Sequence, residues 1–188
     1  MSEPLKIAIT GKLRSGKDTA ARYLMTDHGF DVPISFGAAL KRIYHELFPW
    51  IPTDRKPREG YQKLGQLIRE HFDEDVWIKH AERMVEFSLD KRYINGVVIS
   101  DLRQPNEYDW ARKNGFIVVR ITAPDELRIE RARLAGDEFS ADNLAHETEQ
   151  FVDGFEVDYE LHNDGDYGDL FYQIDGMIRD IRRKEAIE

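Results

Sequence analysis

Short apolar runs alternate along the chain with longer stretches in which apolar residues recur at helical spacing. Five apolar runs predict buried strands: Leu5–Thr10, Phe30–Phe36, Gly96–Ser100, Phe116–Thr122 and Tyr159–His162. The second run contains a proline, a residue that central strands avoid. Strands that alternate with helices form a parallel sheet covered on both faces. The pattern therefore predicts an α/β fold, a three-layer sandwich around a five-stranded parallel sheet.

Amphipathic helices are expected between these strands, because apolar residues recur there every three or four positions. One follows the first strand directly, and others are expected at about 40–47, 61–72, 75–89, 105–114, 124–135 and 167–181. Three prolines and a glycine predict a loop over Pro49–Gly60. No repeat, low-complexity tract or linker divides the chain, so its 188 residues are expected to form a single domain.

Composition narrows the range of partners. The net charge of −9 disfavours sequence-independent binding to nucleic acid or to an anionic membrane, so neither is expected as a partner. No apolar run is long enough for a membrane span or a signal peptide. The absence of cysteine excludes disulfides and thiolate metal sites and fits a cytoplasmic location. An anionic substrate would need local clusters of lysine and arginine, and the sequence contains several.

The spacing Gly11-x-x-x-x-Gly16-Lys17 is that of a phosphate-binding loop, and it lies where such a loop must lie, between a buried strand and a helix. Glycines let the backbone wrap closely around phosphate oxygens, and N–H groups at the helix start point at the anion. The alternative is an ordinary glycine-rich turn with a surface lysine. As a phosphate-binding loop, the segment predicts that Lys17 reaches the β- and γ-phosphates of ATP. The ATP-binding residues expected here are Gly11, Arg14, Ser15, Gly16, Lys17, Asp18 and Thr19.

Asp18 stands where such loops normally carry a serine or threonine that binds magnesium. Thr19 is one residue further round the helix and suits a contact with the α-phosphate instead. A carboxylate is a good ligand for Mg²⁺ but would be repelled by a bare triphosphate. We therefore expect Asp18 to hold Mg²⁺, directly or through water. The alternative is that it is only an acidic residue favoured by the helix dipole.

The sequence resembles those of P-loop nucleotide kinases of the bacteriophage deoxynucleoside monophosphate kinase type. The likeness covers roughly residues 6–175 and includes ITGKLRSGKDT, SFGAALK, YQKLGQLIREHFDEDVW, VVISDLRQPNE, HETE and ELHNDG. Animal-type phosphomevalonate kinases, which share the Gly-Lys-Asp ending of the loop, are related to them. The resemblance implies a P-loop NTPase core at about 1–36 and 95–188. It also implies a helical acceptor-binding insert at about 37–94 and a small lid at about 128–148.

Two groups of polar residues are expected to bind the acceptor. Asp101 follows a buried strand at the edge where parallel sheets bind ligands, and could orient the acceptor phosphate or a metal-bound water. Arg103, two residues later, suits a bidentate phosphate contact. The resemblance assigns the helices of Lys41 and Arg69 to the acceptor site. From the residues alone, Lys41 and Arg69 could equally be solvent-exposed charges, and Asp101 a residue of a strand-end turn.

Three arginines, Arg128, Arg131 and Arg133, crowd one helix end and are expected to form part of the lid. Phosphoryl transfer gathers negative charge on the equatorial oxygens, which arginines commonly neutralise. The alternative is a charged surface helix with internal ion pairs. By resemblance alone, Asn163 is expected in the turn beneath the ATP base. The predicted catalytic residues are Lys17, Asp101, Arg103 and Arg128.

The leading hypothesis is a kinase that transfers a phosphoryl group from ATP, with Mg²⁺, to a (deoxy)nucleoside monophosphate and so forms the diphosphate. A kinase of the same fold could instead act on phosphomevalonate, dephospho-coenzyme A or another phosphorylated metabolite. A third possibility is a P-loop module that binds a nucleotide as a regulatory switch. The arginine-rich lid favours transfer, because a switch does not need to shield a reaction from water. The sequence leaves the base, the sugar and the oligomeric state open.

Overall fold

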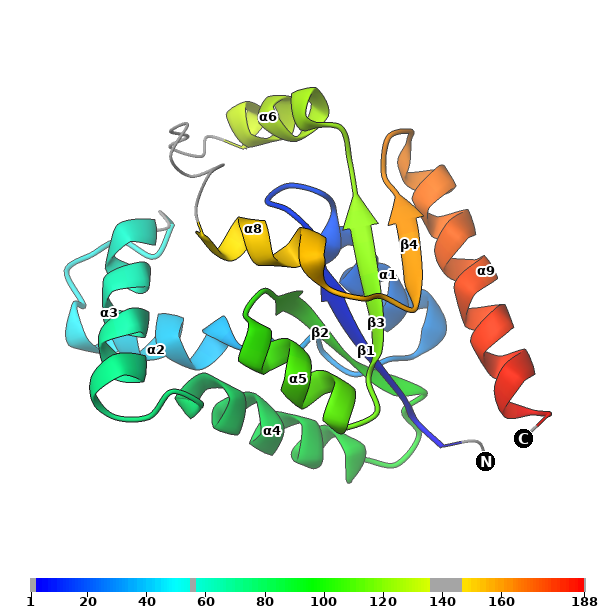
Figure 1. Ribbon diagram of the computed structural model, residues 1–188, viewed down its shortest axis with the longest axis horizontal. Coiled ribbons are helices and arrows are strands. Elements are labelled where there is room, and N and C mark those ends of the chain that lie inside the picture. The colour runs from blue at the N-terminus through cyan, green and yellow to red at the C-terminus, as the bar shows by residue number, and fades with distance from the viewer. Residues whose placement is uncertain (1–2, 55–56, 136–146, 188) are drawn as a thin grey trace.

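A parallel sheet forms the centre of the molecule (Figure 1). The computed structural model describes residues 3–54, 57–135 and 147–187. Within these residues the sheet has four strands in the order β2-β1-β3-β4, and every pair is parallel. The strands are β1 (Leu5–Thr10), β2 (Gly96–Leu102), β3 (Ile117–Thr122) and β4 (Tyr159–His162). The expected parallel α/β architecture is confirmed.

Helices connect the strands and surround the sheet. They are α1 (Lys17–His28), α2 (Gly37–Leu47), α3 (Arg58–His71), α4 (Val76–Leu89), α5 (Pro105–Lys113), α6 (Asp125–Leu134), α8 (Glu147–Gly154) and α9 (Tyr167–Glu185). Each helix expected from the hydrophobic pattern is present. The helix α8 lies in an acidic stretch for which the pattern gave no expectation. None of the described helices is long and apolar enough to cross a membrane.

The prediction of a fifth strand at residues 30–36 is wrong, although the segment does run along the outer edge of β2. It makes two isolated parallel bridges, Phe30 with Gly96 and Ile34 with Ile99. The N–H of Asp31 donates to Gly96 O at 2.9 Å. The next N–H of the segment that donates to β2 is that of Ile34, which binds Val98 O at 2.8 Å. A regular strand would donate again two residues after Asp31, but that position is Pro33, which has no N–H. The ladder is therefore interrupted.

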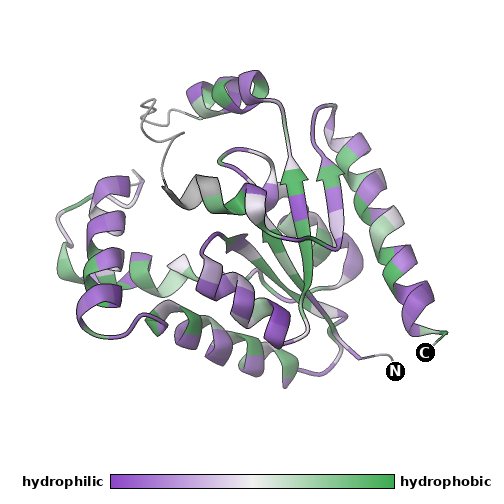
Figure 2. Ribbon diagram, viewed as in Figure 1, coloured by the Kyte–Doolittle hydropathy of each residue, from purple (hydrophilic) through white to green (hydrophobic). Residues whose placement is uncertain are grey.

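Two apolar layers hold the sheet between helices. On one face, side chains of β1, β3 and β4 pack against α1 and α9, with Leu24, Leu170 and Ile174 buried among them. On the other face, Val97 and Ile99 of β2 belong to a second cluster with residues of α4 and α5. The strands β1, β2 and β3 are mostly hydrophobic along their length, whereas the helices mix hydrophobic and hydrophilic residues (Figure 2). A sheet buried on both faces leaves its strand ends as the places where polar groups can gather.

Candidate functional site

The loop between β1 and α1 has the backbone of a phosphate-binding loop. Gly11 and Gly16 have φ angles of +137° and +111°, which L side chains rarely adopt. A Cβ on Gly11 would lie 2.3 Å from the carbonyl oxygen of Ile121, and a Cβ on Gly16 would lie 2.1 Å from Asn163 Nδ2. Both glycines are thus required by the path of the chain as well as by its closeness to neighbouring groups.

Lys17 begins α1 and extends its amine back across this loop. Its Nζ donates to the carbonyl oxygens of Gly11 at 2.6 Å and Lys12 at 2.8 Å, and the residue is only 7% exposed. An ammonium group pinned over a turn of backbone N–H groups creates a strongly positive site at a helix start, where anions bind. This geometry suits the β- and γ-phosphate contact expected for Lys17.

Asp18 and Thr19 occupy the first turn of α1, directly after Lys17. The Asp18 side chain is exposed and Thr19 is half-buried. Magnesium in phosphoryl-transfer sites is commonly held by one or two carboxylates together with phosphate oxygens and water, without a protein cage. A single open carboxylate next to the phosphate-binding loop fits that donor set. No cluster of three metal-binding side chains occurs among the residues that the structure describes.

Asn163 lies against the back of the loop. It is 3% exposed, and its Nδ2 donates to Ser15 O at 2.8 Å while its backbone N–H donates to Thr122 O at 2.8 Å. Arg131 in turn donates from Nη2 to the Asn163 Oδ1 at 3.3 Å and to its carbonyl oxygen at 3.2 Å. These contacts support the loop from the end of β4. A contact of Asn163 with the ATP base stays a prediction.

The three arginines of α6 have different surroundings. Arg128 is 4% exposed; it donates from Nη1 to Leu13 O at 2.9 Å and from Nη2 to Asp125 at 2.6 Å, so its guanidinium lies beside the loop. The hydrogen bond and the positive charge of Arg128 lower the pKa of Asp125. Arg133 is exposed, away from these contacts. Residues 136–146 of the expected lid lie outside the described residues.

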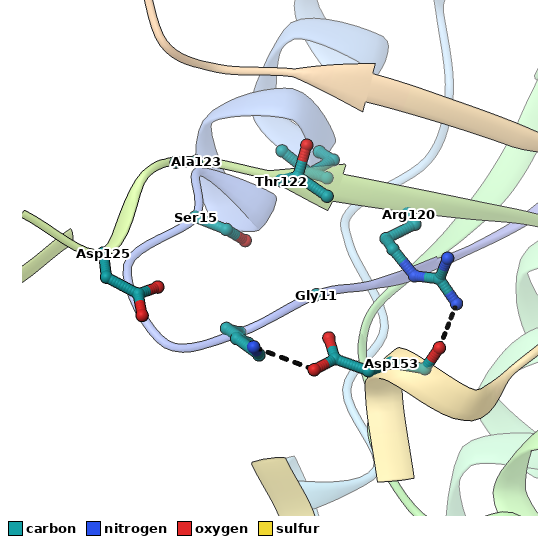
Figure 3. A pocket seen from close by; sticks show the side chains of 9 residues that line it. Gly11, Ser15, Arg120, Thr122, Ala123, Asp125 and Asp153 are labelled. Atoms are coloured by element: carbon teal, nitrogen blue, oxygen red, sulfur yellow. Dashed lines mark hydrogen bonds and ion pairs between the residues drawn. The ribbon is translucent and has the colours of Figure 1, made fainter. Parts of the chain in front are cut away.

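A pocket of about 110 Å³ opens next to the loop, between it and the start of α6 (Figure 3). Its wall includes Ser15, whose Oγ is buried without a hydrogen-bond partner among the described residues. Asp153 at the end of α8 pairs with Lys12 of the loop at 2.8 Å, and Arg120 donates to its carbonyl oxygen at 3.2 Å. Sequence reasoning missed Lys12, Arg120 and Asp153, because nothing in the pattern placed α8 against the loop.

Asp101 of β2 anchors the start of α2. Its carboxylate accepts hydrogen bonds from Ser35 Oγ at 2.5 Å and from the backbone N–H groups of Phe36 at 2.8 Å and Gly37 at 3.1 Å. These donors would otherwise be unpaired at a helix N-terminus. A Cβ on Gly37 would lie 3.4 Å from Asp101 Oδ2 and 3.6 Å from Lys41 Cε, so the two side chains approach each other over Gly37.

The side chain of Arg69 and the backbone of Arg103 both contact Glu107, which was not among the predicted site residues. The Glu107 Oε2 accepts the backbone N–H groups of Arg103 and Gln104, each at 3.0 Å, and Oε1 lies 3.4 Å from Arg69 Nη2. Glu107 is 4% exposed. Glu107 is the third helical residue after the N-cap Gln104, which is the position of a capping box. This pattern can be recognised in the sequence, but it does not predict the contact with Arg69. Burial, assisted by the charge of Asp101, raises the pKa of Glu107 to about 7.

The raised pKa of Glu107 predicts a pH-dependent stability. A folded-state pKa of about 7, against 4.5 when exposed, means that the folded protein binds this proton more tightly. The contribution of Glu107 to the free energy of unfolding is complete below its pKa in the unfolded state. It is lost as the pH rises through its pKa in the folded state, a change of about 3 kcal/mol. Urea unfolding of wild type and Glu107→Gln at several pH values between about 4.5 and 8 measures it. The free energy of unfolding of wild type should fall relative to that of the variant, and parallel curves would contradict the assignment.

Sequence comparison places this site in a known family. The family model AAA_18, described as an AAA domain, matches residues 7–152 and so spans the loop, helices α2, α3 and α4 and the end of β2. The chain belongs to the AAA_18 family. A protein of Acanthamoeba polyphaga mimivirus named "Putative deoxynucleotide monophosphate kinase" is 30% identical over 143 residues, which cover 63% of this chain and 74% of that protein.

Solved structures resemble the fold at lower identity. The protein TT1252 from Thermus thermophilus superposes with a TM-score of 0.60 at 22% identity, covering 95% of this chain and 98% of that one. Shikimate kinase from Bacteroides thetaiotaomicron gives a TM-score of 0.54 at 15% identity, with the same coverage. At these identities the likeness concerns the fold alone, and the fold is that of the P-loop kinases.

Proposed function

We propose that this member of the AAA_18 family transfers a phosphoryl group from ATP to a (deoxy)nucleoside monophosphate. The observation that carries the proposal is that two groups of cationic residues lie at the carboxyl ends of the parallel strands. Lys17 lies over the phosphate-binding loop, and Arg69 and Arg103 lie near the end of β2. Asp101 accepts backbone N–H groups, and Glu107 does so as well while its other oxygen pairs with Arg69. The arginines of the second region suit an acceptor that carries a phosphate.

In this proposal the chain divides the work between its parts. The core at about 1–36 and 95–188 binds ATP, and the insert at about 37–94 binds the acceptor through Lys41 and Arg69. Within that insert, α4 also packs beneath the sheet, so the acceptor-binding surface falls to α2 and α3. The lid at about 128–148 contributes Arg128, Arg131 and Arg133. A cytoplasmic location accords with this activity, and the oligomeric state is left open.

The reaction needs positioning and charge stabilisation more than covalent chemistry from the protein. Lys17, held over the loop, would donate to phosphate oxygens as they gain charge, while Arg128, beside the loop, adds a second cation. Arg103 and Arg69 would grip the acceptor phosphate and hold its oxygen in line for attack. Magnesium, when bound through Asp18, would neutralise charge on the β- and γ-phosphates.

The test is an ADP-release assay with a panel of acceptors. It comprises ribo- and deoxyribonucleoside monophosphates, phosphomevalonate, dephospho-coenzyme A and shikimate, the last because shikimate kinases share the fold. We expect at least one nucleoside monophosphate to raise ADP release about 100-fold or more above the rate with ATP alone, since correct positioning of two reactants is worth at least that factor. Turnover with only a non-nucleotide acceptor would replace the proposal. Slow hydrolysis that no acceptor accelerates would indicate a nucleotide-dependent switch.

The mimivirus relative supports a nucleotide acceptor by the name it carries. No comparable observation favours the shikimate-like acceptors, because the similarity to shikimate kinases is one of fold at 15% identity.

A further inference from the structure

The carboxylate of Glu107 divides its two oxygens between two parts of the molecule. Oε2 accepts both backbone N–H groups at the start of α5, while Oε1 faces Arg69 on α3, 38 residues earlier in the chain. Helix capping accounts for Oε2 alone. A carboxylate that served only as a cap would need no partner on another helix.

The environment makes the second contact costly and therefore informative. Glu107 is 4% exposed and Arg69 has 22% of its side chain exposed, so both charges are largely withdrawn from water. Such charges are retained only where they are paired. Arg69 has five N–H donors in a fixed plane, and its Nη2 faces Glu107. Its Nε and Nη1 have no hydrogen-bond partner among the described residues, which leaves them for a ligand on the partly exposed side.

We infer that Glu107 is a positioning residue for the acceptor, which holds the guanidinium of Arg69 so that its remaining donors grip the acceptor phosphate. The inference rests on the proposed function for the identity of that acceptor. The same carboxylate ties α3 to the β2–α5 loop, because it contacts the guanidinium of Arg69 and the backbone N–H of Arg103. An arginine already held in place binds a phosphate without first having to order its long side chain.

Charges from two other elements act on Glu107. Asp101 on β2 repels its negative charge and Arg69 on α3 attracts it, while Arg103, in the loop before α5, contacts it through its backbone N–H. With its pKa raised to about 7, Glu107 is ionised chiefly above neutral pH. Its hold on Arg69 should accordingly strengthen as the pH rises from about 6 to 8.

Glutamine at position 107 separates the two tasks. The single oxygen of its amide can accept the two backbone N–H groups, which are partly buried and gain from a partner. The NH₂ group then faces Arg69, donor against donor. Glu107→Gln should thus keep the start of α5 and lose the orientation of Arg69, whereas alanine would lose both.

Two measurements at about pH 8 test the inference. The first is a calorimetric titration of inorganic phosphate into the full-length protein with Mg·ADP present, which needs no turnover. Arg69→Gln defines the part of the phosphate affinity that depends on this arginine. Glu107→Gln should weaken phosphate binding by about tenfold, the equivalent of one charged hydrogen bond, and the double variant should be no weaker than Arg69→Gln alone.

The second measurement is the KM for the best acceptor of the panel and for ATP. Glu107→Gln should raise the acceptor KM about tenfold and change the ATP KM less than twofold. Asp158→Asn is the matched control, because Asp158 also accepts a backbone N–H, that of Val118, and pairs with an arginine, Arg112, but lies before the amino-terminal end of β4. It should alter stability without moving either KM.

The results distinguish this inference from the proposed function. If no acceptor is turned over but phosphate binding still depends on Arg69 and Glu107, the function is wrong and the positioning role stands. The inference is overturned if phosphate affinity does not depend on Arg69, if it is unchanged in Glu107→Gln, or if it rises there, since Glu107 would then only compete with the anion.

Discussion

Replacing Lys17 with alanine is expected to lower the rate of phosphoryl transfer by about 100- to 1000-fold, the usual loss when one preorganised donor to a developing charge is removed. The amine lies over the loop, held by two backbone carbonyl oxygens, and is 7% exposed. It therefore needs little reorganisation when charge builds up on the phosphate oxygens. The effect should fall mainly on kcat.

The kinetic measurement compares kcat at saturating ATP for wild type, Lys17→Ala and a control. Lys184→Ala is the control, because this lysine is exposed on the last turn of α9 and its partner Asp180 keeps a second cation, Arg183. Far-ultraviolet circular dichroism should show that all three proteins are folded. An unchanged kcat in Lys17→Ala would remove the loop from the mechanism.

Removing Mg²⁺ with EDTA is expected to weaken ATP binding to wild type for two reasons, the loss of the metal from the phosphates and the negative charge of Asp18. We expect the second to lower the affinity by a further factor of about 30. Two like charges about 4 Å apart repel by roughly 4 kcal/mol at an effective dielectric near 20. Solvent at this exposed position should reduce the repulsion to about half, which is a factor of roughly 30. The carboxylate of Asp18 would thus lower the affinity for metal-free ATP.

Two substitutions separate attraction for the metal from repulsion of the phosphates. Asp18→Ser restores the hydroxyl common at this position and should keep appreciable activity, whereas Asp18→Ala should transfer slowly. Both should bind metal-free ATP better than wild type does. Calorimetry on the three proteins with and without Mg²⁺ gives the affinities. If wild type binds ATP equally well in both conditions, Asp18 acts only as a carboxylate favoured by the helix dipole.

The parallel fold was predictable because its signals are local. The buried strands read as apolar runs, and α9 shows a helical repeat that includes Leu170, Ile174 and Ile181. The expected fifth strand failed for a reason that hydrophobicity does not measure, the missing N–H of Pro33. The helix α8 escaped prediction because much of its position depends on Arg120, which donates to carbonyl oxygens near its end from a strand 32 residues away.

The candidate site divides along the same line. The loop could be read from three letters at a fixed spacing, Gly11, Gly16 and Lys17, because the chain itself forms that site. The partners of Glu107 could not, since the contact with Arg69 joins segments that only the folded chain brings together. Asp101 was expected at the ligand-binding edge, but its use as an anchor for α2 depends on the path of residues 35–37.

The interrupted edge beside β2 also bears on the behaviour of the protein in concentrated solution. An exposed regular strand offers a row of free N–H and C=O groups on which another chain can add a strand. Here the outermost segment contains Pro33 and shifts its hydrogen bonding by one residue between Asp31 and Ile34. A second molecule would find no continuous ladder to extend. The same proline that removes a strand from the sheet therefore protects this side of the molecule against edge-to-edge aggregation.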